Sequence, residues 1–206
     1  IGMGVYVFYS YKIKPYLKGL DLAAYTSWLF KSILKIGIPS ALQFIFEVTA
    51  FSVAAIMMGW IGTKELAAHQ IAISLAGLTY MFATGFSAGA VVRVGNYFGM
   101  KDKKQLRMAG FVPFVSVAIF MGFCGFIFII GNKLLPSIYI GDAEVIEVAG
   151  ILLIIAAFFQ ISDGVQVVGL GALRGMTDVK TPTIITFIAF WIIGLPFAYI
   201  LSRSFS

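Results

Sequence analysis

Two carboxylic acids lie within apolar stretches long enough to cross a membrane. Glu47 is midway along residues 33–60, and Asp163 lies deep in residues 148–173. A charged residue at the centre of a membrane helix costs about 2.5 to 3.5 kcal/mol, and such residues usually mark ion or substrate routes. A carboxyl group in a medium of low dielectric can exchange a proton or be neutralised by Na⁺. The two residues therefore predict ion-coupling chemistry, with a candidate Na⁺ site at Glu47 and Asp163.

Amide side chains accompany both carboxylates at helical spacing. Gln43 precedes Glu47 by four residues, and Gln160 and Gln166 lie three residues to either side of Asp163. Residues three or four apart share one face of a helix. Each set should therefore form a polar stripe that faces protein or water and avoids lipid.

Each candidate residue also has a structural alternative. Glu47 could be a neutral carboxyl in a hydrogen bond between helices, and Asp163 could cap a broken helix near Gly164. Aromatic side chains at the depth of the carboxylates could line an apolar cavity, or pack against lipid and core. They are Phe44, Phe46, Phe51, Tyr80, Phe82, Phe86, Phe158 and Phe159.

The composition is that of an all-α integral membrane protein. Hydrophobic residues make up 60% of the 206, charged residues only 12%, and the mean hydropathy is +0.97. The apolar runs reach the roughly 20 residues of a spanning helix and lack the short alternation of barrel strands. We expect the end of an earlier helix and a connector in residues 1–32, then a membrane unit in 33–206. Its five spans are 33–60, 66–92, 108–135, 148–173 and 182–201.

Basic residues gather in alternate connections between these spans. Counting residues 10–35 as the first, the first, third and fifth connections hold twelve of the fifteen Lys and Arg. The other side holds Lys64, Lys133, Arg203 and the acidic run 142–147. The positive-inside rule makes the basic side cytoplasmic. Five spans put the chain ends on opposite sides, so we expect a truncated chain.

The sequence gives little support for disulfides, metal sites, nucleotide binding or nucleic-acid binding. The single Cys124 allows no disulfide within the chain, and the single His69 makes no credible metal site. No GxxxxGK[ST] loop occurs, and the glycines of residues 169–175 have GxGxxxG spacing at the end of a membrane helix. The basic run 101–107 is juxtamembrane, which favours contact with membrane lipid over nucleic acid. We expect no nucleotide or organic cofactor.

Several strings together resemble the second half of a MATE (multidrug and toxic compound extrusion) transporter of the NorM-like bacterial type. In order they are residues 35–40 (KIGIPS), 46–48 (FEV), 67–72 (AAHQIA), 93–95 (RVG), 171–175 (GALRG), 181–182 (TP) and 191–196 (WIIGLP).

The resemblance implies twelve helices in two lobes around a V-shaped cavity in a bacterial inner (plasma) membrane. The chain would supply the tail of helix six and helices seven to eleven, without helix twelve and the N-terminal lobe. It implies an antiporter, not an enzyme, that exports cationic or amphipathic organic drugs against Na⁺ or H⁺. Glu47 and Asp163 match the acidic residues of helices seven and ten. Phe159 stands where some relatives would offer a hydroxyl-bearing aromatic, which leaves the coupling ion open.

Three other functions are weighed against this one. A lipid-linked oligosaccharide flippase of the same superfamily should carry Lys or Arg near the centres of its spans, and these spans have none there. An intramembrane aspartyl protease needs two aspartates and a GxGD-type motif, whereas one of the two acids here is Glu47. A non-transporting membrane scaffold stays open because half a transporter can be inactive alone.

The asymmetry of basic residues makes topology testable. In a Cys124-free background, cysteines replacing Lys103 and Lys180 should react with an impermeant maleimide only from the cytoplasm, and one replacing Asp142 only from outside. Labelling of intact and permeabilised cells measures this. Reversed labelling would contradict both the orientation and the number of spans.

Overall fold

The structure, a computed structural model, describes residues 27–204, with side chains described to residue 200. The predicted end of a helix and most of the predicted connector, residues 1–26, lie outside the described residues. The chain divides into two compact units, Ile1–Ile38 and Pro39–Ser206. The described part of the first is Ser27–Ile38, the opening turns of a helix. The packing and the site described below lie in the second unit.

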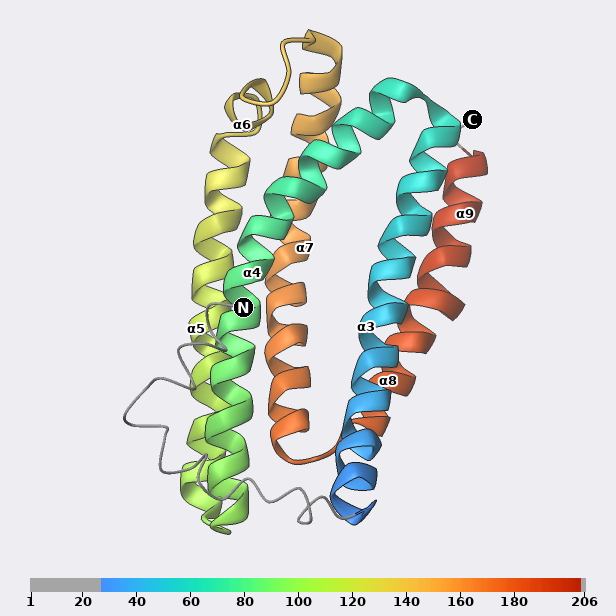
Figure 1. The fold of residues 1–206 in the computed structure, drawn as a ribbon. Coiled ribbons are helices and arrows are strands. Elements are labelled where there is room, and N and C mark those ends of the chain that lie inside the picture. The colour runs from blue at the N-terminus through green and yellow to red at the C-terminus, as the bar shows by residue number, and fades with distance from the viewer. Residues whose placement is uncertain (1–26, 205–206) are drawn as a thin grey trace, which may run out of the picture. The chain divides into compact units, whose positions relative to one another are not determined.

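The described residues form helices joined by short connections (Figure 1). Five helical segments are long and apolar enough to cross a membrane, the last of them Lys180–Ile200. The predicted all-α membrane fold with five spans is confirmed. In order the elements are α3 (Ser27–Ile61), α4 (Thr63–Gly99), α5 (Lys103–Ile130), α6 (Leu134–Ser137), α7 (Ala143–Gly175), α8 (Lys180–Phe187), the π-helix η2 (Ile188–Gly194) and α9 (Leu195–Ser204).

The helices extend beyond most of the predicted spans because hydropathy marks only their apolar middles. α4 and α7 run past their predicted spans at both ends, and the predicted division between residues 32 and 33 falls inside α3. The predicted third span is too long at its end. α5 stops at Ile130, where Gly131 caps it, and the short α6 follows.

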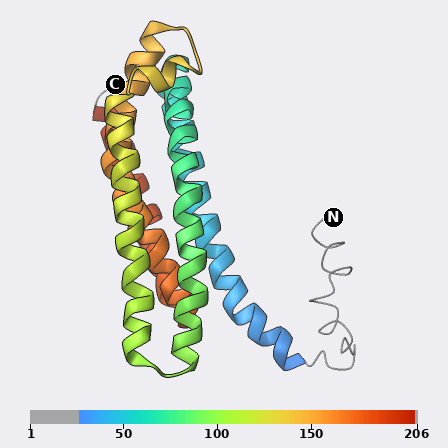
Figure 2. The ribbon, with the colours of Figure 1, turned by 90° about the vertical axis from the view of Figure 1, so that its left-hand side faces the viewer.

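Helices α4, α5 and α7 pack side by side as a three-helix bundle (Figures 1 and 2). Its core holds Met121, Leu153 and Val168, which are fully buried. Glycines allow the helices to approach closely: a Cβ on Gly171 would lie 2.7 Å from the backbone oxygen of Ser87. Small residues are the usual means of close helix contact in membranes.

α3 is held to the last span by contacts of a different kind. The Thr183 hydroxyl donates to the Pro39 carbonyl oxygen at 2.9 Å, and the Trp191 indole N–H donates to the Phe46 carbonyl oxygen at 3.1 Å. The rings of Phe46 and Phe187 lie 4.9 Å apart. α3 therefore contacts α8 and η2 through hydrogen bonds and aromatic side chains.

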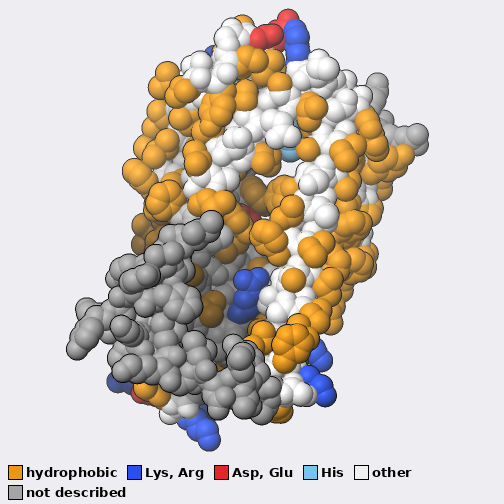
Figure 3. Space-filling model, viewed as in Figure 1, with side chains coloured by type: hydrophobic (Ala, Val, Ile, Leu, Met, Phe, Trp, Pro, Cys, Tyr) orange, Lys and Arg blue, Asp and Glu red, His pale blue; other side chains and the backbone are white. Residues whose placement is uncertain are grey.

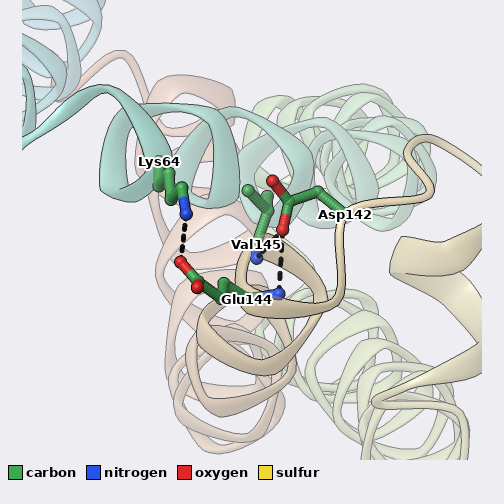
Figure 4. A network of polar contacts seen from close by, with 4 residues as sticks. All are labelled: Lys64, Asp142, Glu144 and Val145. Atoms are coloured by element: carbon green, nitrogen blue, oxygen red, sulfur yellow. Dashed lines mark hydrogen bonds and ion pairs between the residues drawn. The ribbon is translucent and has the colours of Figure 1, made fainter.

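Charged side chains mark the ends of the helices. Figure 3 shows hydrophobic side chains along the helices and most of the visible charged ones at their two ends. At one end Lys64 of α4 pairs with Glu144 in the first turn of α7 (Figure 4). Asp142 caps α7 there, accepting from the Glu144 N–H at 2.9 Å. The connections before α4 and α7 thus share one end, as predicted, and the orientation of that end stays a prediction.

Replacing Gly171 by Ala should destabilise the bundle. The new Cβ would meet both the hydroxyl and the backbone oxygen of Ser87, and overpacking of this kind costs about 1 to 3 kcal/mol. Gly89→Ala is the matched control, since a Cβ there meets nothing within 4 Å. Thermal unfolding in detergent should show a lower midpoint for Gly171→Ala only. Equal midpoints would contradict the close packing of α4 and α7.

Candidate functional site

A cavity of about 620 Å³ opens between α3, α4 and α7. Helical periodicity supplies its walls, because residues three, four and seven apart return to one face. From α3 come Phe44, Glu47, Val48, Phe51, Ser52, Ala55 and Ile56; from α4 come His69, Gln70, Ile73, Ala76, Gly77, Tyr80 and Met81; from α7 come Phe159 and Asp163.

Both predicted carboxylates line this cavity and are buried in its walls. Glu47 is 6% exposed and Asp163 is 9% exposed. The Tyr80 hydroxyl of α4 donates to Glu47 Oε1 at 3.1 Å. The fold thus brings together two acids that are far apart in the sequence, and it gives one of them a phenolic partner.

The alternative role of Asp163 as a cap is wrong. α7 is continuous from Ala143 to Gly175, so Asp163 and Gly164 lie in its interior. Gly164 serves packing instead, since a Cβ there would lie 2.7 Å from Met121 Cγ of α5. The alternative role of Glu47, a hydrogen bond between helices, has a partner in Tyr80 and must be separated from coupling by experiment.

The predicted amide stripe on α7 divides into residues with different surroundings. Gln160 points into the bundle core, accepting from the Thr79 hydroxyl at 2.9 Å and donating to the Met121 carbonyl oxygen at 3.2 Å. Gln166 is exposed. Neither lines the cavity. Gln160 therefore joins α4, α5 and α7, and only Asp163 of this stripe reaches the site.

Gln43 lies one turn from Glu47 and is in contact with Arg174. It is 1% exposed, and its Oε1 accepts from Arg174 Nη2 at 3.2 Å. The sequence grouped Arg174 with the basic connections. In the structure it belongs to the last turn of α7 and is half-buried. One available signal was its spacing of eleven residues from Asp163, close to three helical turns, which puts both on one face.

Four of the eight singled-out aromatics line the cavity: Phe44, Phe51, Tyr80 and Phe159. The others have partners elsewhere or face outward. Phe46 packs on Phe187, Phe82 and Phe86 lie against Phe120, and Phe158 is exposed. The site is thus an apolar, partly aromatic chamber with two acids in its walls.

The side chains of the chamber are of kinds that can contact cations. Carboxylate and phenol oxygens suit hard cations and protons, and aromatic faces attract organic cations. Across residues 27–204, no group of three or more His, Cys, Asp or Glu is arranged to hold a metal ion. The side chains present fit a monovalent ion, a proton or an organic cation bound by few ligands.

Fold and site together define a multi-pass α-helical membrane protein with a buried acidic chamber. The sequence profile of the MatE family matches residues 39–200. The chain belongs to this family, the MATE transporters that its motifs resemble.

Curated relatives include bacterial proteins whose names refer to multidrug resistance. The multidrug resistance protein MdtK of Proteus mirabilis is 38% identical over 175 residues, covering 84% of this chain and 38% of the relative. The probable multidrug resistance protein NorM of Brucella suis biovar 1 is 37% identical over 180 residues, covering 83% and 37%. The multidrug resistance protein NorM of Photobacterium profundum is 37% identical over 172 residues, covering 84% and 38%. The chain therefore spans well under half the length of these relatives.

The placement of Gln160 predicts that its replacement lowers the stability of the bundle. Gln160→Met keeps the volume but removes two buried hydrogen bonds, which should cost about 1 to 3 kcal/mol. Gln166→Met, at the exposed position, is the control. Thermal unfolding should separate the two variants. Equal unfolding midpoints for the two variants would contradict this structural role.

Proposed function

We propose that this chain is part of a bacterial inner-membrane antiporter that exports cationic or amphipathic organic compounds in exchange for Na⁺ or H⁺. Glu47 and Asp163 are its coupling residues. The observation that carries the proposal is the meeting of these two buried acids in one chamber. Membership of the MatE family and the names of the relatives support the substrate class. If the chain is one part of a longer transporter, that also explains why it matches well under half of each relative's length.

The size and lining of the chamber suit such substrates. A volume of about 620 Å³ falls in the range of small-molecule pockets, roughly 300 to 1,000 Å³. Phe44, Phe51 and Phe159 offer ring faces, and the two acids offer negative charge. An organic cation and a coupling ion would therefore compete for the same carboxylates.

Competition of this kind is sufficient for antiport. A ligand shifts a conformational equilibrium only by its difference in affinity between the two states. If the ion favours one arrangement of the helices around Glu47 and Asp163, and the drug favours the other, binding of one promotes release of the other. In this exchange the chain supplies the binding surface, through the charge, hydrogen bonds and shape of the chamber.

The flippase remains the second candidate. Its pyrophosphate substrate would need basic groups, and the one half-buried Lys or Arg among residues 27–200, Arg174, contacts Gln43 and does not line the chamber. The chamber lining contains two acids, one histidine and no Lys or Arg. Negative charge at the binding surface favours a cationic substrate over a pyrophosphate.

Charge removal tests the proposal directly. In the complete transporter, Glu47→Gln and Asp163→Asn should each abolish ion-dependent drug efflux, because each keeps size and hydrogen bonding but removes the ionisable group. Drug efflux and dissipation of the Na⁺ or pH gradient are measured in the same vesicles. A purely structural carboxyl predicts near-normal transport and equal or better stability.

Glu144→Gln is the matched control, since Glu144 is an exposed acid at the start of α7 outside the chamber. It should transport normally. If Asp163→Asn also transports normally while Glu47→Gln fails, coupling reduces to Glu47 alone. Normal transport by both site variants would refute the assignment of the site.

A further inference from the structure

Arg174 occupies an unusual place for a basic residue in this protein. Every other Lys or Arg among residues 27–200 is exposed, whereas Arg174 is half-buried. A guanidinium withdrawn from water costs several kcal/mol unless it is well paired. The position of Arg174 therefore calls for a partner inside the protein.

The Arg174 side chain extends from α7 toward the part of α3 that carries Glu47. Side chains on a helix lean toward its N-terminus, and Arg174 is in the last turn of α7. The side chain therefore runs back along α7 toward the level of Asp163. It reaches α3, where Nη2 donates to Gln43 Oε1 at 3.2 Å.

This contact is incompletely hydrogen-bonded. Gln43 Nε2 and Arg174 Nε are buried and have no partner, and no other buried side-chain nitrogen or oxygen among the described residues is in that condition. Both atoms are N–H donors, and a buried donor without a partner costs about 1 to 3 kcal/mol. An anionic acceptor at this place would satisfy the two unpaired donors and also balance the positive charge.

The position of Glu47 makes it the nearest candidate for this anionic acceptor. It lies four residues after Gln43 on the same face of α3, about 6 Å along the helix. Tyr80 occupies only Oε1. A small shift of α3 against α7 would bring the guanidinium to the other oxygen, and α3 is tied to its neighbours more lightly than the bundle helices are to each other.

We propose that the Arg174 guanidinium pairs with Glu47 and neutralises its charge when the coupling ion leaves. While the ion is bound, Gln43, one helical turn before Glu47, binds the guanidinium instead. This inference rests on the proposed function. Arg174 and the ion then compete for one carboxylate, so Arg174 lowers the affinity of Glu47 for the ion and speeds its release. Gln43 and Arg174 are positioning residues that act through Glu47.

Other titratable groups near Glu47 set the background for this competition. Tyr80 and His69 line the chamber from α4, and Asp163 lines it from α7. From the last span, Phe187, Phe190 and Trp191 contact this part of α3, and none of them is charged. Arg174 is the one fixed positive charge among these groups.

The test uses two variants that should act in opposite directions. Arg174→Gln removes the competing charge, so the Na⁺ concentration for half-maximal efflux at fixed pH should fall about tenfold, the order expected for one nearby unit charge. If H⁺ is the coupling ion, the pH midpoint should instead move about one unit higher. Gln43→Met frees Arg174 to pair with Glu47, so ion affinity should fall. Arg174→Lys should behave as the unsubstituted protein.

The controls separate the possible failures. Arg93→Gln, which removes an exposed Arg of α4, should leave ion affinity unchanged. Drug efflux is measured in proteoliposomes of the complete transporter, with Glu47→Gln as reference. If Glu47→Gln keeps its ion dependence, the proposed function fails. If Glu47→Gln loses it but Arg174→Gln and Gln43→Met shift affinity in the same direction or not at all, Arg174 is only a structural tie and the inference is overturned.

Discussion

The high cost of placing charge in a medium of low dielectric governs this structure. Lipid offers no hydrogen bonds, so polar groups must find partners within the protein or collect where water or ions can reach them. Gln160 follows the first course inside the bundle, and Glu47 and Asp163 follow the second in the chamber. The exposed charged residues lie at the helix ends. The few buried polar groups therefore identify both the core contacts and the site.

The helices around the chamber differ in how firmly they are held. α4, α5 and α7 meet through glycines and a close-packed core, which leaves little room for displacement. α3 contacts its neighbours mainly through hydrogen bonds to carbonyl oxygens and tilted aromatic rings. Glu47 stands on the more lightly held helix and Asp163 on the close-packed one. A shift of α3 would thus change the distance between the acids while the bundle kept its shape.

The sequence predicted the elements and the two acids because both depend on local signals. Apolar length marks a span, and a carboxylate inside one is conspicuous. The sequence put Gln160 and Gln166 on one stripe, but each three-residue step falls about 60° short of a full turn, so the two residues lie roughly 120° apart and have separate surroundings. It also misplaced Arg174, because positive charge near a helix end usually indicates topology. Only the approach of α3 to α7 shows that this guanidinium turns inward.

The π-helix in the last span has a consequence for how insertions and deletions act there. η2 closes its turns one residue later than an α-helix does, so residues 188–194 hold more chain per turn. This spacing lets Thr183 of α8 and Trp191 of η2 both reach α3. Deleting one residue from η2 would convert its wide turn into an α-helical one, so the span would keep nearly the same length and the residues after it nearly the same facing. Homologues one residue shorter here would therefore present the same face of α9 to their surroundings.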